Sequence, residues 1–286
     1  MNNEDEGNLF HFNRVDPMTD GEFRRIARYM SEHYGIEMKD KRSIVEGRLE
    51  NHVGELGYRS YTEIMNAAEH NPKGPEDKLL VDILTTNYTY FMREFEHFEF
   101  WKNEVLPELK RMEEHSRDLR VWCGASSTGE EPYTIAMVLS DYFGLDSCEW
   151  DTGILATDVS VQALETAVRG IYPMEKIDML PYGWKERYFR RVDSGYYQAV
   201  RALRKKITFS KLNLMDQFLF KKKMHTIFMK NVMIYFDNET RIDLLNRVYD
   251  VLEPGGYLFI GMTENIDRNR TGFEYVRPAV YRKPFK

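Results

Sequence analysis

The chain has 286 residues, of which 42% are hydrophobic and 30% charged, and its formal net charge is −6. A chain of this length buries about three quarters of its unfolded surface on folding, which is enough for one full domain and a smaller second one. No apolar run approaches the length of a membrane span, the negative charge argues against bulk binding to nucleic acid, and the two cysteines, Cys123 and Cys148, exclude a disulfide framework or a thiolate metal cluster.

The N-terminal part, residues 1–86, predicts a helical domain without strands. Its first residues are acidic and unlike a signal peptide, so we expect a cytoplasmic location. Capping boxes at Thr19–Glu22 and Ser60–Glu63 begin the first and third helices, and residues 72–75, with two prolines and a glycine, precede the fourth. We expect the second helix to run from Asp40 to about Val53.

The second helix carries apolar and basic residues on different sides. Its apolar residues are expected to point inward: Ile44, Val45, Leu49 and Val53. Its basic residues are expected on or near the outer side: Lys39, Lys41, Arg42 and Arg48. This basic side is either a solvated face or a contact surface for an acidic protein partner.

An aromatic segment, residues 87–94, follows the helical domain. Its residues alternate between two sets: Thr89, Phe91 and Arg93 in one, Tyr88, Tyr90 and Met92 in the other. The segment either covers a pocket at the edge of the following sheet or is a hinge that packs two domains together. Residues 95–112 then predict one long amphipathic helix, which leads into a strand at residue 119.

Residues 119–139 predict a strand, a glycine-rich turn and a helix, the arrangement that begins a ligand site in open α/β sheets. Gly124 and Gly129 enclose a run of small residues. A phosphate loop has Lys followed by Ser or Thr after its last glycine, whereas this chain has Glu130 and Glu131 there. The two carboxylates either cap the helix or favour a ligand with hydroxyl groups and positive charge, such as S-adenosylmethionine.

Asp158 ends the next predicted strand, residues 152–158, and a helix begins directly after it. An acidic residue at the end of the second strand binds ribose hydroxyls in dinucleotide folds, although a lone Asp in this place also serves as an N-cap. Together with the glycine loop and Glu131, Asp158 favours the ribose interpretation.

The segment from about residue 170 to 211 interrupts the alternation of strands and helices. Residues 196–200 and 206–209 predict strands, and we expect a small β-subdomain inserted in the sheet order. This is the most basic part of the chain, but neither an RNA-binding module nor an arginine-rich repeat accompanies the charges. We therefore expect no nucleic-acid partner.

The rest of the chain returns to the α/β pattern. Strands at residues 225–229 and 257–261 flank a helix at 239–252, and residues 273–282 predict a terminal antiparallel hairpin. Asn231 follows the first of these strands and either contacts a ligand or occupies a turn. The pattern predicts a mostly parallel, doubly wound sheet. The seven histidines lack metal-ligand spacing and no nucleophile motif is present, so we expect no metal site.

Several stretches together resemble the CheR family of chemotaxis receptor methyltransferases. They are, in chain order, Asn87-x-Thr89-x-Phe91-x-Arg93-Glu94, residues 127–133, Ala156 to Asp158, Gly170 to Tyr172, Asn213-Leu214, Asn231 to Phe236 and Pro254 to Phe259. The match runs in order from about residue 20 to the end. The blocks Thr-Gly-Glu-Glu-Pro-Tyr and Asn-Val-Met-Ile-Tyr-Phe are highly specific together.

The resemblance implies an α/β fold: a Rossmann-like methyltransferase domain dependent on S-adenosylmethionine (SAM), residues 87–286, with a small β-subdomain, preceded by an all-α N-terminal domain. It implies methyl transfer from SAM to glutamate side chains of chemoreceptors, which gives glutamate methyl esters and S-adenosylhomocysteine in chemotaxis adaptation. The implied partner is the cytoplasmic helical bundle of a receptor. We expect the enzyme to be a monomer that does not insert into the membrane.

The resemblance also implies site residues by motif position. The residues that hold the donor would be Asn87, Thr89, Arg93, Glu131, Asp158, Asn213, Leu214, Asn231 and Val232. Arg93 and Tyr235 would lie nearest the methyl group and the incoming carboxylate.

The chain departs from the family pattern in a few places. Its loop reads Cys-Gly-Ala-Ser-Ser where Ser-Ala-Gly-Cys-Ser is usual, Lys230 replaces an Arg, and Met92 replaces an aromatic residue. The segment from Phe189 to Asn213 is shorter than in members whose β-subdomain grips a receptor's C-terminal pentapeptide, so we expect a tether-independent enzyme. The alternatives are a similar methyltransferase that acts on a non-chemotaxis protein and a SAM-binding regulatory module.

Overall fold

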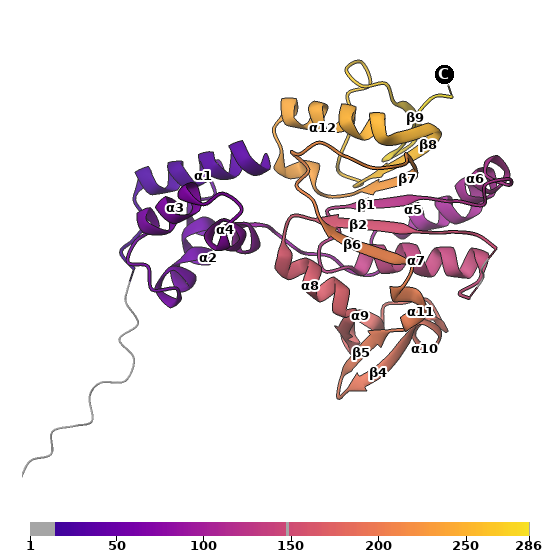
Figure 1. The fold of residues 1–286 in the computed structure, drawn as a ribbon, viewed down its shortest axis with the longest axis horizontal. Helices are drawn as coiled ribbons and strands as arrows, with labels where there is room; N and C mark the ends of the chain where they lie inside the picture. Colours follow the sequence, from indigo (N-terminus) through magenta and orange to yellow (C-terminus); the bar gives the residue numbers. More distant parts are fainter. Residues whose placement is uncertain (1–14, 147–148, 286) are drawn as a thin grey trace, which may run out of the picture. The chain divides into compact units, whose positions relative to one another are not determined.

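The computed structural model describes residues 15–146 and 149–285, which divide between Thr86 and Asn87 into two compact units (Figure 1). Cys148 and the acidic N-terminus lie outside the described residues. Within the described ranges, no helix has the length and apolar character needed to cross a membrane.

The first unit contains four helices between residues 15 and 86: α1 (Asp20–Tyr34), α2 (Arg42–Glu55), α3 (Tyr61–His70) and α4 (Pro75–Leu84). The helical, strand-free prediction is confirmed for these residues. The capping box at Thr19 is complete. At Ser60 the side chain caps α3, but the Glu63 carboxylate accepts from the Arg59 N–H (2.8 Å), so the reciprocal half of the box is displaced by one residue.

A buried carboxylate connects the helices of this unit. Asp77 on α4 is 1% exposed and accepts hydrogen bonds from the hydroxyls of Tyr29 (2.8 Å) and Tyr34 (2.6 Å) on α1. Burial, reinforced by this carboxylate, raises the pKa of Tyr29 well above its usual value. The phenol therefore remains a donor, and the buried polar groups satisfy each other.

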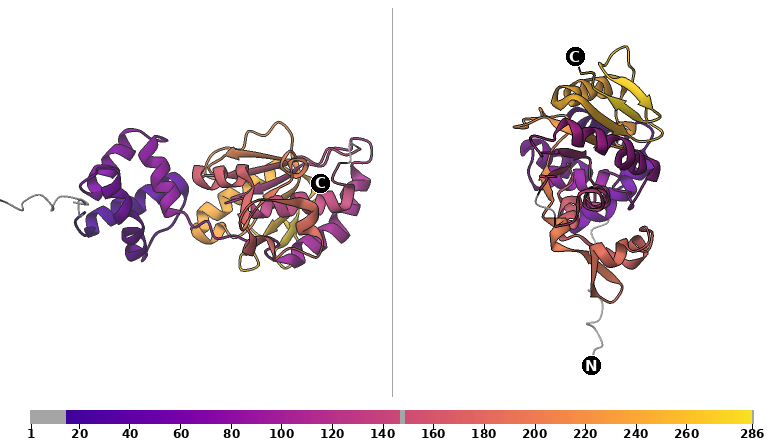
Figure 2. Two further views of the ribbon diagram at one scale, coloured as in Figure 1. Left: turned by 90° about the horizontal axis from the view of Figure 1, so that it is seen from below. Right: turned by 90° about the vertical axis from the view of Figure 1, so that its right-hand side faces the viewer.

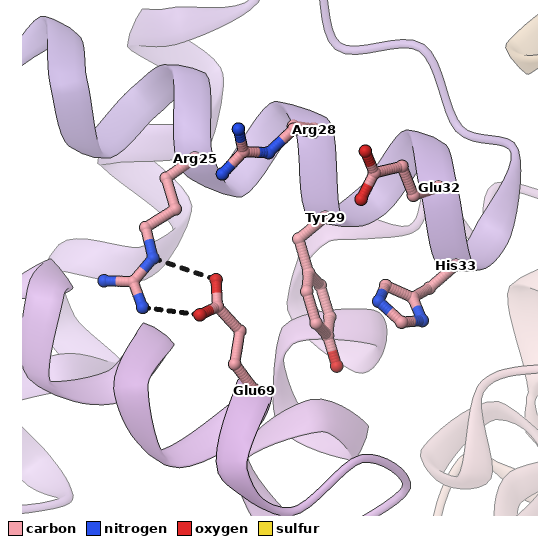
Figure 3. Close-up of a pocket in the computed structure, with 6 residues that line it drawn as sticks. All are labelled: Arg25, Arg28, Tyr29, Glu32, His33 and Glu69. Atoms are coloured by element: carbon pink, nitrogen blue, oxygen red, sulfur yellow. Dashed lines mark hydrogen bonds and ion pairs between the residues drawn. The ribbon is translucent and has the colours of Figure 1, made fainter.

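Arg25 on α1 forms two parallel bonds, of 2.9 and 2.6 Å, with the carboxylate of Glu69 on α3 (Figure 3). The pair lines a surface pocket together with Arg28, Tyr29, Glu32 and His33. Because the pocket contains two guanidinium groups and two carboxylates, it has no clear preference for ligands of either charge.

The predicted basic side of α2 is partly internal. Arg48 donates to the carbonyls of Leu84 and Thr85, each at 3.1 Å, at the C-terminal end of α4. The last carbonyls of a helix lack partners within the helix and attract a guanidinium group, which explains the inward direction of Arg48. The expected inward position of Ile44 is wrong, since this side chain is 51% exposed, whereas the other predicted apolar positions of α2 are buried.

The second unit is built on a seven-stranded sheet with the order β6-β2-β1-β7-β8-β10-β9. The strands are β1 (Val121–Gly124), β2 (Ile154–Asp158), β6 (Ile207–Lys211), β7 (Met224–Met229), β8 (Leu252–Ile260), β9 (Glu274–Arg277) and β10 (Val280–Arg282). The first five in this order pair in parallel, and β10 and β9 form the antiparallel hairpin. The predicted doubly wound α/β fold is confirmed.

The connections place a potential ligand crevice at the end of β1. The helices α7 (Glu130–Phe143), α8 (Val161–Arg169) and α12 (Asn238–Val251) lie between successive strands of the chain. β1 has β2 on one side and β7 on the other, so the strand order reverses there. In open α/β sheets, ligands bind outside the carboxyl ends of the strands at such a point.

The predicted helix at residues 95–112 is interrupted. A π-helical turn, η1 (Trp101–Val105), separates α5 (Phe95–Phe100) from α6 (Leu106–Met112). Pro107 has no N–H for the carbonyl of the preceding turn, and its ring would clash with that carbonyl, so the wider turn accommodates it. The predicted apolar face is nevertheless buried: Phe98, Trp101, Val105 and Leu109.

A second, antiparallel sheet has the order β3-β5-β4 and consists of β3 (Ile171–Pro173), β4 (Phe189–Asp193) and β5 (Tyr196–Ala199). The short helices α9 (Met174–Ile177) and α10 (Trp184–Tyr188) accompany it, on the side of the unit opposite the C-terminal hairpin (Figure 1 and Figure 2). Residues 207–211, expected at the end of this subdomain, instead follow α11 (Arg201–Arg204) as β6, which pairs with β2 in the main sheet.

Candidate active site

The loop after β1 is folded against the end of β2. The Ser126 N–H donates to the Thr157 carbonyl (2.9 Å), and the Ser127 N–H donates to the Asp158 carboxylate (2.7 Å). Ser126 is buried, and its hydroxyl oxygen has no hydrogen-bond partner among the described residues. The loop therefore presents an unpaired hydroxyl group close to a carboxylate at the carboxyl edge of the sheet.

Gly129 ends this loop at a position that requires glycine. Its φ is +99°, and a Cβ atom there would lie 2.7 Å from the Tyr172 hydroxyl oxygen and 2.8 Å from the Ala167 Cβ. The Tyr172 hydroxyl in turn donates to the Thr128 carbonyl at 2.8 Å. Close packing against α8 and β3 thus fixes the turn that precedes α7.

Asp158, the predicted ribose-binding residue, is 6% exposed and shapes the loop. Its second oxygen accepts from the Ser160 N–H at 2.9 Å, while the Ser160 side chain is the N-cap of α8. The N-cap role considered for Asp158 therefore belongs to Ser160. A carboxylate accepts up to about four hydrogen bonds, so Asp158 can hold backbone N–H groups and ligand hydroxyls together.

The two glutamates that begin α7 have side chains in different environments. Glu130 is fully buried, pairs with Lys176 of α9 and accepts from the Thr128 hydroxyl (2.6 Å), so it connects α7 to the small sheet. Glu131 pairs with Lys230 at 2.7 Å and accepts weakly from the Cys123 thiol at 3.4 Å. Glu131, which the sequence predicts to face the ligand, thus lies beside the ends of β1 and β7, whereas the Glu130 carboxylate binds a residue of α9.

Lys230 and Glu94 form a buried charge cluster with Glu131. The Lys230 side chain is 1% exposed, and its Nζ lies 3.4 Å from Glu94 Oε2 and donates to the Arg93 carbonyl at 2.8 Å. The other oxygen of Glu94 accepts from the Met262 N–H at 3.0 Å. Burial acts to raise the pKa of Glu94, but the charge of Lys230 and these hydrogen bonds leave it below its usual value. Sequence reasoning did not include Lys230 or Glu94 among the site residues.

Two further groups of this region are neutral near pH 7. Burial, with a contribution from the charge of Lys230, lowers the pKa of His97 to about 4. Burial also raises the pKa of the Cys123 thiol well above its usual value. An uncharged imidazole and an uncharged thiol therefore lie beside the contacts of Lys230 with Glu94 and Glu131.

Glu264 holds the segment after β7 through backbone hydrogen bonds. Its carboxylate accepts from the N–H groups of Gly261 (2.7 Å), Asn231 (2.9 Å), Met233 (2.7 Å) and Ile234 (3.3 Å). Burial raises the pKa of Glu264 despite these bonds. The sequence signal that could identify Glu264 is its position as an acidic residue shortly after β8, at the same edge of the sheet as the other candidate residues.

The aromatic segment 87–94 belongs to the second unit and packs against the small antiparallel sheet and the glycine loop. Residues 91–94 form a turn, so the predicted alternation does not continue to its end. Phe91 is 1% exposed and contacts the rings of Tyr172 and Phe189 edge to face. The Asn87 carbonyl accepts from the Ser127 hydroxyl (3.0 Å), which joins the start of the segment to the glycine loop.

Arg93 has most of its guanidinium donors free. Its Nη1 donates to the Tyr88 carbonyl at 3.2 Å, and the guanidinium group lies 5.8 Å from the ring centroid of Tyr90. No other hydrogen bond or ion pair joins the Arg93 side chain to the described part of the chain. A partly exposed guanidinium group in this state is suited to bind a carboxylate.

The remaining predicted residues lie in neighbouring segments. Asn213 and Leu214 follow β6, and Asn213 accepts from the Met215 N–H at 3.0 Å. Asn231 and Val232 follow β7 and precede a 3-10 turn, η2 (Met233–Tyr235), which contains the half-buried Tyr235. All candidate residues thus occur at the end of β2, after β1, β6 or β7, or within residues 87–94.

Backbone strain is concentrated in the same segments. Non-glycine residues with positive φ include Met92, Glu94, Ala125, Ser127 and Asn231. Each such conformation costs roughly 1–3 kcal/mol and persists where surrounding structure enforces it, most often at functional sites. The positive φ of Asn231 is a conformation that Asn tolerates in turns, and it is compatible with contact to a ligand. No group of three His, Cys, Asp or Glu side chains within residues 15–146 and 149–285 is arranged to hold a metal ion.

SAM carries ribose hydroxyls and positive charge, which suit the chemistry of this sheet edge. The Asp158 carboxylate and the Ser126 hydroxyl can accept from hydroxyl groups, and no lysine follows the loop to bind a phosphate. The fold and the site define a SAM-dependent methyltransferase. The chain belongs to the CheR methyltransferase family: residues 87–281 match its SAM binding domain, and residues 21–85 match its all-alpha domain.

Curated relatives are similar over nearly the whole chain. A chemotaxis protein methyltransferase of Borreliella burgdorferi is 38% identical over 276 residues, which is 95% of this chain and 97% of that protein. The Escherichia coli protein of the same name is 35% identical, with 92% of this chain and 91% of that protein covered. Chemotaxis protein methyltransferase 2 of Pseudomonas aeruginosa is 34% identical, with 90% and 88% covered. The predicted family, enzyme class and donor are confirmed.

Proposed function

We propose that the protein transfers a methyl group from SAM to glutamate side chains in the cytoplasmic helical bundle of chemoreceptors, as part of chemotaxis adaptation. The products would be glutamate methyl esters and S-adenosylhomocysteine. The names of the relatives support a role in chemotaxis. The observation that carries the choice of a carboxylate acceptor is the guanidinium group of Arg93, which makes a single hydrogen bond, to the Tyr88 carbonyl, within the described part of the chain. We place the enzyme in the cytoplasm as a monomer.

The acceptor in this proposal needs no general base. A glutamate side chain has a reference pKa of about 4.3, so it is ionised at neutral pH. An enzyme that had to deprotonate its acceptor would need a base with a pKa near neutrality. At this site His97 is buried with a pKa of about 4, and burial keeps the Cys123 thiol protonated, so neither meets that requirement.

When bound, SAM would supply a methyl group on a sulfonium centre: a carboxylate oxygen would bond to the methyl carbon in line as the carbon–sulfur bond breaks, and S-adenosylhomocysteine would be the leaving group. The chain's residues bind and orient the reactants and exclude water. We assign donor binding to Asn87, Thr89, Arg93, Glu131, Asp158, Asn213, Leu214, Asn231 and Val232. In this assignment the Asp158 carboxylate accepts from the ribose hydroxyls. Arg93 and Tyr235 orient the incoming carboxylate, with Arg93 acting through its guanidinium donors.

The test uses labelled SAM and purified cytoplasmic fragments of chemoreceptors. We expect label that is released by mild base and that maps to glutamate residues of the fragment. Base-stable label, or no label on any fragment from a protein that binds the donor, would reject the proposal. Base-labile label on a protein outside chemotaxis would support the first alternative, and donor binding without transfer to any protein would support a regulatory module.

We also propose that methylation does not require a receptor's C-terminal pentapeptide. The segment from Phe189 to Asn213 is short, and β4 and β5 are joined by the two-residue turn Ser194–Gly195. We expect calorimetry to detect no binding of such a pentapeptide, and receptor fragments with and without it to be methylated at equal rates. Specific, saturable binding of the pentapeptide would contradict this.

A further inference from the structure

The ammonium group of Lys230 joins three segments of the active site. Its Nζ lies 2.7 Å from Glu131 Oε1 at the start of α7 and 3.4 Å from Glu94 Oε2. It also donates to the Arg93 carbonyl at 2.8 Å and lies 4.8 Å from the ring centroid of Phe98. The side chain is 1% exposed, so these contacts replace hydration rather than compete with it.

The partners of Lys230 are themselves connected to the candidate donor and acceptor residues. Glu94 accepts from the Asn231 side-chain amide at 3.3 Å and from the Met262 N–H at 3.0 Å. The backbone of Arg93, whose carbonyl Lys230 binds, carries the guanidinium group assigned to the acceptor. A single cation thus fixes residues on both sides of the proposed transfer.

Two carboxylates share this one ammonium group. Removal of the cation would leave Glu94 and Glu131 as like charges in a largely dehydrated place, where repulsion and desolvation are expensive. The two side chains would then move apart or bind a proton. Either response would displace Glu131 from the donor and release the turn that carries Arg93.

We propose that Lys230 is a positioning residue that sets the geometry of both donor and acceptor, through Glu131 on one side and through Glu94 and the Arg93 carbonyl on the other. The donor half of this inference stands on the family's SAM-binding domain. The acceptor half rests on the proposed function. Binding of S-adenosylhomocysteine requires no acceptor, so it tests the donor half even if the glutamate acceptor is wrong.

The first experiment compares Lys230→Met with Lys230→Arg. Lys230→Met keeps the length of the side chain without its charge, and we expect it to weaken S-adenosylhomocysteine binding in calorimetry by about tenfold or more, as for other residues that orient binding groups. Lys230→Arg keeps the charge and should bind within about threefold of the wild type. Equal binding by Lys230→Met and the wild type would overturn the proposal.

A matched control separates positioning from general stability. Lys222 lies before the start of β7, is 67% exposed and pairs with Asp118. Its replacement, Lys222→Met, should leave S-adenosylhomocysteine binding unchanged. In the ligand-free protein, hydrogen exchange at the Met262 amide should accelerate in Lys230→Met and remain slow in Lys222→Met. Should Lys230→Met fail to fold, Lys230→Gln decides the question by the same two measurements.

The last experiment tests the shared charge. Because Glu94→Gln keeps an oxygen for the Met262 N–H and removes one carboxylate, it should restore part of the affinity lost in Lys230→Met. The double variant would then bind more tightly than the single lysine variant. Losses of affinity that simply multiply would show that Lys230 does not act through Glu94, and the proposal would be rejected.

Discussion

At the scale of single residues, Arg93 differs from the other charged groups of the site. Within the described residues its guanidinium group makes one hydrogen bond, to the Tyr88 carbonyl, whereas the buried Lys230 and the half-buried Glu264 make several contacts with the surrounding chain. A group with few internal contacts contributes little to stability, so its substitution reports on function.

We expect Arg93→Ala to lower the rate of methylation by about 100-fold, because misplacement of a reacting group has an effect of this size. The melting temperature should remain within about two degrees of the wild type, as for a substitution without a structural contact. Arg93→Lys should recover only part of the rate, since a lysine lacks the planar pair of donors. A wild-type rate in Arg93→Ala would remove this residue from the mechanism.

Asp158 has two roles that a pair of variants can separate. We expect Asp158→Ala to weaken donor binding by about tenfold to a hundredfold in calorimetry, because hydrogen bonds to a charged group contribute about 1.5–3 kcal/mol. Asp158→Asn keeps an acceptor for the Ser127 N–H, so it should preserve the loop better than Asp158→Ala. It should still weaken the binding of the methyl donor. Unchanged affinity in both variants would be incompatible with the ribose assignment.

At the scale of elements, the turn between β1 and α7 determines where Glu131 and the loop hydroxyls lie. We expect Gly129→Ala to lower the free energy of unfolding by about 2–3 kcal/mol, since it combines a positive φ with a close contact. Gly183→Ala is the matched control, because φ there is +78° but a Cβ atom would meet nothing within 4 Å. Its loss should be about 1 kcal/mol. Equal losses in denaturant unfolding would show that the contact with Tyr172 has no influence.

The elements that sequence predicted well are those whose own residues determine them. The complete capping box at Thr19 and the apolar periodicity of α7 and α12 are local signals, and these helices begin near the predicted residues. β4 was not predicted, because Arg190 and Arg191 give it no apolar alternation. It forms as an edge strand that pairs with β5 alone.

The other differences between the predicted and the observed elements arise from contacts between residues that are far apart in the sequence. β6 belongs to the main sheet because it pairs with β2, a choice that residues 207–211 do not specify by themselves. The site likewise depends on contacts that the local sequence does not specify. Asp158 and Glu131 were visible as acidic residues near strand ends, whereas the contact of Lys230 with Glu94 joins positions 136 apart (230 − 94) and depends on the completed sheet. The sequence therefore indicates acidic residues at strand ends better than it indicates the side chains that hold them in place.

At the scale of the whole molecule, the buried histidines make stability depend on pH. The pKa of His97 is lowered from 6.5 to about 4, chiefly by burial, and burial also lowers the pKa of His225. Between about pH 4 and 6.5, His97 therefore binds a proton in the unfolded chain but not in the folded chain. Stability rises with pH wherever the unfolded state binds more protons, so the contribution of these two histidines falls as the pH decreases from about 6.5 towards 4.

The variant His97→Phe should weaken this dependence. In urea unfolding at pH 7, 6 and 5, we expect the wild type to lose stability between pH 6.5 and 5 more steeply than His97→Phe, which has no imidazole to protonate. Because His225 still titrates, the variant should retain part of the slope. His115→Phe, at an exposed position, should follow the wild type. Identical slopes for the wild type and His97→Phe would mean that the His97 imidazole can bind a proton in the folded state, and the buried charge cluster around Lys230 would then have to contain water or move.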